Sequence, residues 1–219
     1  MTAPVHHLPA DTVASYANGE APEAEALLVA THLALCPACR DEVSRLEALG
    51  GVALEGLEPA PALDLDAMLA RLDEPEPEPT VAPPPRVAPT GQLAALPEPL
   101  RSYVGDFDGL PWKTKIPGVR TAELGLSLGE VPVRLSVLKP GLKLPRHTHA
   151  GRELTLVLQG GFENGHGHYV RGDVEVGLPE QVHAMVIDPG DPCIALSVNE
   201  GALEPVDLLG KLVSKFVSF

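Results

Sequence analysis

Two sets of residues that can bind a metal ion lie at opposite ends of the chain. In the N-terminal set, His32, Cys36 and Cys39 follow one another closely, and His6 and His7 lie upstream. Thiolate and imidazole groups form the tetrahedral shell that structural Zn²⁺ takes in proteins. We therefore predict a structural zinc site on His32, Cys36 and Cys39, with either His6 or His7 as the fourth ligand.

The C-terminal set contains His147, His149 and Glu153, with His183 further along the chain. Side chains alternate along a β-strand, so His147 and His149 would point to one face, and Glu153 at the start of the next strand can reach the same ion. Histidine and carboxylate ligands accept several divalent metals. The identity of this second ion therefore stays open between Zn²⁺, Fe²⁺ and Mn²⁺.

Other reactive side chains have simpler interpretations. The Cys36-x-x-Cys39 spacing also occurs in redox pairs, but those follow a β-strand, whereas helix is predicted here. We expect His166 and His168 to be solvated loop residues, with a secondary metal site as the alternative. Cys193 lies in an apolar segment and is predicted to be buried, with redox sensing as the alternative.

Composition and charge restrict the partners and the compartment. The net charge is −14, which argues against direct binding to nucleic acid or to anionic membranes. Residues 1–80 carry −12 of this charge, so a basic protein partner for that half is compatible, although solubility alone would explain it. No signal peptide, membrane span or pair of cysteines for a structural disulfide is evident. We expect a cytoplasmic protein.

The N-terminal part shows helical patterns. We predict helices from Asp11 to Ala17, from Pro22 to Leu35, from Pro37 to Leu49 with Gly50-Gly51 as its end, and from Leu63 to Leu72. The last helix has an apolar stripe that either packs on its own domain or docks into a partner, formed by Leu65, Met68, Leu69 and Leu72.

The rest of the chain predicts a linker and a β domain. Residues 73–91 are rich in Pro and Glu and cannot bury a core. From residue 92 onward, short alternating apolar segments separated by Gly and Pro predict a sandwich or barrel. The predicted architecture is a multidomain α plus all-β protein with a helical domain at 1–72, a linker at 73–91 and a β-barrel at 92–219, so that the two halves can be separate folds.

The N-terminal half resembles a known family. The strings Ala30-Thr31-His32-Leu33 and Leu35-Cys36 through Cys39-Arg40 are similar to the ChrR type of zinc-binding anti-sigma factor. This resemblance implies zinc ligands at His7, His32, Cys36 and Cys39, and favours His7 over His6. It also implies a partner, an extracytoplasmic-function (group IV) sigma factor whose surfaces the helical domain covers.

The C-terminal half resembles a cupin. The pattern Gly141-x5-His147-x-His149-x3-Glu153-x6-Gly160 matches the first cupin motif at each spaced position. Gly172-Asp173, Pro179 and His183 resemble the second motif, although its usual glycine is replaced around Gln181 and the spacing is one residue shorter. The cupin resemblance implies that His183 is the fourth ligand. The similarity to the ChrR type, which continues to Lys211-Leu212-Val213, implies that the metal is zinc.

Two functions from different classes follow. The resemblance implies a non-enzymatic anti-sigma factor whose cupin senses an oxidative signal such as singlet oxygen, or binds a small molecule, and releases the sigma factor. The alternative is a metal-dependent cupin enzyme of the dioxygenase kind with an accessory zinc domain. A third role for the cupin is to mediate a dimer. No acid or base beyond the ligands is evident, which disfavours the enzyme.

Overall fold

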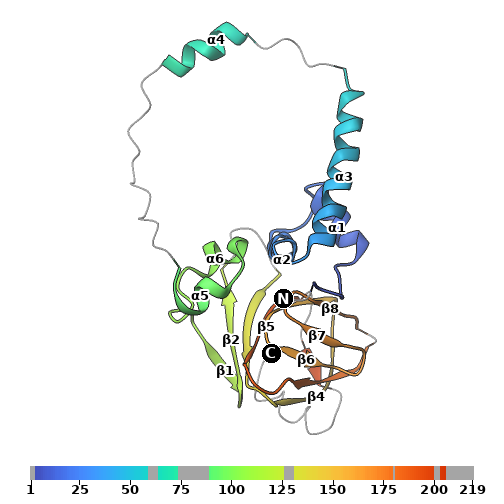
Figure 1. Ribbon diagram of the computed structural model, residues 1–219, viewed down its shortest axis with the longest axis vertical. Helices are drawn as coiled ribbons and strands as arrows, with labels where there is room; N and C mark the ends of the chain where they lie inside the picture. The colour runs from blue at the N-terminus through green and yellow to red at the C-terminus, as the bar shows by residue number, and fades with distance from the viewer. Residues whose placement is uncertain are drawn as a thin grey trace.

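The structure, a computed structural model, describes residues 3–58, 64–73, 89–125, 131–179, 181–199 and 203–205. Residues 74–88 of the predicted linker lie outside this range, as do Leu63 and the segment 211–213. Figure 1 shows helices α1, α2 and α3 against one end of a β-barrel, and helix α4 well away from both. Among the described helices, none has the length and apolar character needed to cross a membrane.

Three helices form the N-terminal bundle: α1 (Ala10–Ala17), α2 (Glu23–Leu33) and α3 (Pro37–Glu55). The predicted starts of α2 and α3 at prolines are confirmed, because Pro22 is the N-cap of α2 and Pro37 is the first residue of α3. The first helix begins after Pro9 rather than at Asp11. The helices bury apolar side chains against one another, among them Val13, Leu28 and Val43.

The predicted end of the third helix at Gly50-Gly51 is wrong. Helix α3 continues through both glycines to Glu55. Neither has the positive φ of a glycine that ends a helix, whereas Gly19 after α1 does, with φ of 74°. A glycine inside a helix costs only about 1 kcal/mol relative to Ala, which neighbouring turns can offset. The second half of α3 therefore extends beyond the bundle (Figure 1).

Further short helices precede the barrel. Helix α4 (Leu65–Ala70), capped by Asp64, leads into the 3-10 turn η1 (Arg71–Asp73), and α5 (Gly91–Ala95) and α6 (Glu98–Val104) follow. The expectation of β structure from residue 92 is therefore wrong for the first turns. Leu100 and Val104 of α6 are buried at four-residue spacing, which is a helical period, and α6 packs against α2.

The barrel consists of two antiparallel sheets. One has the strand order β1 (Lys113–Ile116), β2 (Val119–Leu124), β3 (Val133–Leu138), β10 (Cys193–Asn199), β5 (Glu153–Gln159) and β8 (Val174–Gly177). The other has the order β11 (Leu203–Pro205), β4 (Lys143–His149), β9 (His183–Ile187), β6 (Gly161–Glu163) and β7 (His168–Val170). The predicted β structure of the C-terminal part is confirmed from Lys113 onward.

The six-stranded sheet is buried on its outer face by the helices. Leu135, Leu156 and Leu196 are fully buried in one apolar cluster with Leu28 of α2 and Leu100 of α6. Alternate residues on the same strands point into the barrel, where they line a cavity. The two halves were expected to be separate folds, but the described residues of both share one core.

Candidate metal centres

The N-terminal cluster brings together His7, His32, Cys36 and Cys39, whose ligand atoms all lie within 4.8 Å of one another. His7 Nδ1 lies 3.3 Å from Cys36 Sγ and 3.6 Å from Cys39 Sγ. His32 lies in the last turn of α2, and Cys36 is the N-cap of α3, so the tight turn between the helices positions three of the four side chains. The set suits a tetrahedral zinc ion.

His32 has the protonation state that a metal ligand needs. Its ring is fully buried, and Nδ1 donates to the carbonyl of Gly172 over 2.9 Å, which leaves Nε2 without a proton. Nε2 makes no hydrogen bond in the described part of the chain. Burial lowers the pKa of His32 to about 4, so the ring is neutral at pH 7. An orphaned, buried lone pair beside two thiols fits a zinc ion.

Burial also raises the pKa of Cys39 to about 11. Without an ion, the thiol therefore stays protonated near neutral pH. A bound metal would displace this proton, because thiolate is the form that coordinates.

His6, the rival to His7, lies outside the cluster. Its ring packs on Tyr169 with centroids 4.3 Å apart, and Nδ1 lies 3.4 Å from a carboxylate oxygen of Asp173. Asp173 is fully buried and accepts hydrogen bonds from the backbone N–H groups of Val5, His6 and Val170. Burial alone would raise the pKa of Asp173, but these donors hold it below its usual value. The carboxylate thereby fixes the segment before His7 to the β7–β8 turn.

The C-terminal cluster consists of three buried histidines, His147 and His149 of β4 and His183 of β9. Their ligand nitrogens lie within 4.8 Å of one another, and His149 Nε2 is 3.0 Å from His183 Nε2. Glu153, at the start of β5, places Oε2 3.2 Å from His149 Nε2 but does not belong to this group of three. Three converging imidazoles with an adjacent carboxylate fit a divalent ion.

Neighbouring groups fix two of these rings. His147 Nδ1 donates to the carbonyl of Pro145 over 2.9 Å, and His183 Nδ1 lies 2.8 Å from Oε1 of Glu175. Both contacts leave the Nε2 lone pair available to an ion. Glu175 is itself buried and also accepts from Asn164. Glu175 was not among the predicted site residues. An acidic residue between Val174 and Val176 in a buried strand is a signal of a functional role.

Protonation competes with metal binding at this centre. Burial lowers the pKa of His149 to about 4, so this ring is neutral at pH 7. Burial raises the pKa of Glu153 to about 7, and the neighbouring Glu175 adds to the increase. Burial would lower the pKa of His183, but the hydrogen bond to Glu175 raises it overall. Glu153 and His183 would both have to lose a proton to bind an ion, so binding at this centre would become more favourable as the pH rises.

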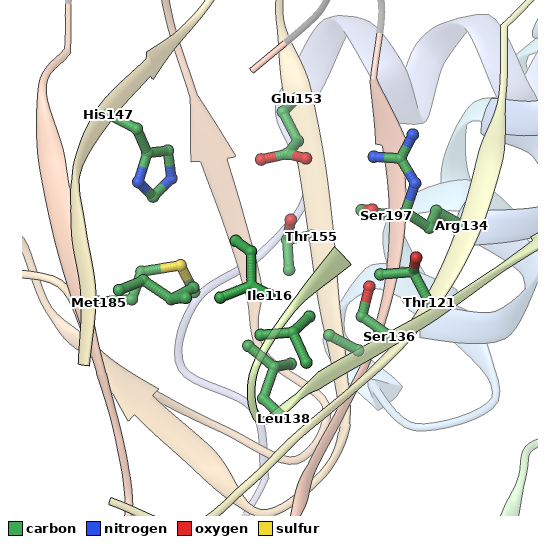
Figure 2. A pocket seen from close by; sticks show the side chains of 13 residues that line it. Ile116, Thr121, Arg134, Ser136, Leu138, His147, Glu153, Thr155, Met185 and Ser197 are labelled. Atoms are coloured by element: carbon green, nitrogen blue, oxygen red, sulfur yellow. The ribbon is translucent and has the colours of Figure 1, made fainter. Parts of the chain in front are cut away.

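A cavity of about 140 Å³ inside the barrel is lined in part by His147 and Glu153. Figure 2 shows His147 and Glu153 at its upper edge, Met185 on one side, and Arg134 and Ser197 on the other. The cavity has room for several waters or one small organic molecule.

The remaining candidate residues lie apart from both clusters. His168 begins β7, and its Nε2 lies 2.8 Å from Asp188, while His166 lies in the preceding turn. Cys193 is fully buried, as predicted, and burial raises the pKa of its thiol to about 12. The apolar stripe of α4 is exposed, with 50–79% of the surface of each member accessible: Leu65, Met68, Leu69 and Leu72.

A helical Cys/His cluster that precedes a barrel with a three-histidine centre defines a class, that of proteins joining a zinc-finger-like module to a cupin. Residues 101–204 match the family model of the ChrR cupin-like domain, and residues 11–40 match a zinc-finger family model. The anti-sigma-E factor ChrR of Cereibacter sphaeroides is 37% identical over 214 residues, which cover 96% of this chain and 97% of that protein. The chain belongs to the ChrR family.

A solved structure agrees with this assignment. The crystal structure of Rhodobacter sphaeroides SigE in complex with the anti-sigma factor ChrR matches with a TM-score of 0.75 and 35% sequence identity. The match covers 90% of this chain and all of the matched chain. The predicted fold class, a helical zinc-finger region followed by a cupin, is confirmed.

Proposed function

We propose that this protein is an anti-sigma factor that binds and inhibits an extracytoplasmic-function sigma factor in the cytoplasm. The observation that carries the proposal is a pair of separate apolar helix faces that no other described residue covers, hereafter together the docking surface. One face lies on α4 and η1 and the other on the second half of α3; their residues are Leu49, Val52, Leu54, Leu65, Met68, Leu69 and Leu72. Exposed apolar patches on water-soluble helices mark protein-binding sites.

Family membership supports the choice of partner. A ChrR protein that is similar over nearly the whole chain forms a complex with the sigma factor SigE. Residues 1–80 carry a net charge of −12, which is compatible with the basic surfaces of a DNA-binding partner.

In this proposal the N-terminal ion has a structural role. Zinc on His7, His32, Cys36 and Cys39 joins the N-terminal segment to α2 and α3. It would hold the first turn of α3, whose second half carries part of the docking surface. Small domains of this kind depend on the metal for folding.

The cupin centre is the proposed sensor. His147, His149 and His183, with Glu153 beside them, would hold a divalent ion, with Zn²⁺ favoured over Fe²⁺ or Mn²⁺ by the family. An oxidative signal, singlet oxygen or a related oxidant, would change the ligands or a small bound molecule. We do not propose an enzyme. Glu175 is a buried acid beside the metal ligands, but its carboxylate already contacts His183 and accepts a hydrogen bond from Asn164.

Contacts between the two halves provide a route from sensor to binder. Glu175 contacts His183 and lies on β8, two residues after Asp173. Asp173 and Gly172 in turn hold His6 and the zinc ligand His32. A change in the cupin centre that moves β8 would therefore also move Asp173 and Gly172, and through their hydrogen bonds the backbone of His6 and the ring of His32.

Co-expression of the full chain with extracytoplasmic-function sigma factors, followed by affinity capture, tests the proposal. We expect capture of a sigma factor, and its loss when Leu65, Met68, Leu69 and Leu72 are all changed to Ser. A matched control changes Leu178 and Val186, which are exposed on the barrel, to Ser and should leave capture intact. If the full chain captures no sigma factor, it is not an anti-sigma factor.

A further inference from the structure

The cavity beside the cupin centre is lined mainly by apolar groups, but a set of polar side chains lies on the inner face of the six-stranded sheet. Thr121, Arg134, Ser136, Thr155 and Ser197 form this polar wall. Leu138 continues the same face of β3, and Met185 of β9 lies on the other sheet (Figure 2). Small barrels are usually filled by side chains. A polar interior wall over an open volume is therefore unusual and indicates a ligand.

Strand register explains how the polar wall arises. Ser197 of β10 lies directly opposite Arg134 of β3 on one side and Thr155 of β5 on the other. Ser136 likewise lies opposite Thr121 of β2. Because side chains alternate, the intervening leucines face the helices and these polar residues all face the cavity.

Within the described residues, the Arg134 guanidinium has only a loose carboxylate partner, Glu123, whose side chain is 57% exposed. The nearest carboxylate to the Arg134 guanidinium is Glu123 Oε1 at 3.6 Å, beyond hydrogen-bond distance. The Arg134 side chain is only 22% exposed, so water solvates it incompletely. Over the described part of the chain, its donors and the hydroxyls of Thr155 and Ser197 form no hydrogen bonds to protein groups. A guanidinium held in this way favours an anionic partner.

We propose that the cavity binds a small monocarboxylate with a second oxygen function, such as an oxo or hydroxy group. The carboxylate would pair with the Arg134 fork and the wall hydroxyls, a bidentate geometry that arginine favours. The second oxygen would face the three histidines, and a short apolar stem would contact Leu138 and Met185. Glu153 also lines the cavity, which disfavours a doubly charged anion such as phosphate.

The binding site stands on the cavity alone, and only its use as a signal input rests on the proposed anti-sigma function. The test measures binding to the full-length, metal-loaded protein by titration calorimetry. The probes are acetoacetate and 3-hydroxybutyrate, with acetoacetamide as the uncharged match. We expect saturable binding of both carboxylates and at least about tenfold weaker binding of the amide, because a charge-assisted pair is lost.

Variants assign the site. Arg134→Gln should weaken acetoacetate binding at least about tenfold, and Arg134→Lys should restore part of it. The matched control is Arg120→Gln on the adjacent strand, where the guanidinium lies 4.8 Å from the Trp112 ring centroid outside the cavity. If Arg134→Gln does not fold, the double variant Thr155→Val, Ser197→Ala takes its place and should also weaken binding.

Equal binding of acetoacetate and acetoacetamide, binding that survives the Arg134 or wall-hydroxyl variants, or no saturable binding of either carboxylate would each overturn the inference. Sigma-factor capture is measured on the same preparations. Capture without carboxylate binding rejects only the cavity ligand, whereas carboxylate binding without capture rejects only the anti-sigma function.

Discussion

At the scale of single residues, both centres depend on groups that are not ligands. The Gly172 carbonyl fixes the tautomer of His32, and Glu175 does the same for His183. Gly172 lies in the turn between β7 and β8, and Glu175 lies in β8. The ligands that they orient, His32 and His183, are about 150 residues apart in the chain. Residues that orient a ligand are therefore as important to each centre as the ligands themselves.

Glu175→Gln should weaken metal binding at the cupin centre by about tenfold or more, because the charged acceptor of His183 Nδ1–H is lost. The N-terminal zinc should be retained. Competition with a chromophoric chelator, read together with total metal content, measures both sites. Glu163→Gln, an exposed residue of β6, is the control. An unchanged cupin-site affinity would show that Glu175 does not orient His183.

At the scale of elements, helix α3 has two parts. Its first turns carry Cys39 and the buried Val43, and its last turns carry the exposed docking residues. Gly50 and Gly51 lie among the exposed turns of the second part, and a Cβ at either position would meet no atom within 4 Å. The glycines therefore weaken the projecting half of the helix without a packing reason.

Gly50→Ala and Gly51→Ala should each stabilise α3 by up to about 1 kcal/mol and raise its helicity, because both backbones are already helical. Circular dichroism and urea unfolding measure these effects. Gly19→Ala is the control with the opposite expected sign. A Cβ at Gly19 also meets no atom within 4 Å, but its φ of 74° disfavours alanine, so the free energy of unfolding should fall. A loss of helicity in the α3 variants would contradict this account.

At the scale of the whole molecule, the helices and the barrel share one hydrophobic core in the described residues. Leu28 and Leu100 complete the core of the six-stranded sheet. Arg152, which precedes the Glu153 carboxylate, reaches back to Asp11 and Glu25 at 3.2 and 2.9 Å. Loss of the N-terminal bundle would thus expose an apolar sheet face.

Cys39→Ser should remove the N-terminal zinc and also destabilise the barrel. Structural zinc contributes on the order of 10 kcal/mol to the folding of a small domain, and the barrel shares that domain's core. Zinc content, binding of a hydrophobic dye and the urea midpoint monitored at Trp112 measure this. Ser44→Ala, at an exposed position of the same helix, is the control. A barrel of unchanged stability would indicate two independent folds.

The sequence by itself determined the local chemistry. Proline and acidic residues at helix starts predicted α2 and α3, alternation predicted β3 and β8, and an apolar run predicted β5. Spacing placed His147 and His149 on one strand face. Local patterns could not place α5 and α6, because these helices are only five and seven residues long, or the end of α3, where two glycines suggested a stop.

Only the tertiary structure decided which distant residues meet. It brings His7 rather than His6 to the cysteines, because Asp173 of the barrel holds His6 elsewhere. It also places Arg134, Thr155 and Ser197 in one row facing the cupin centre. Such contacts follow from strand register and from packing across more than a hundred residues, and neither is encoded in the spacing of neighbouring residues.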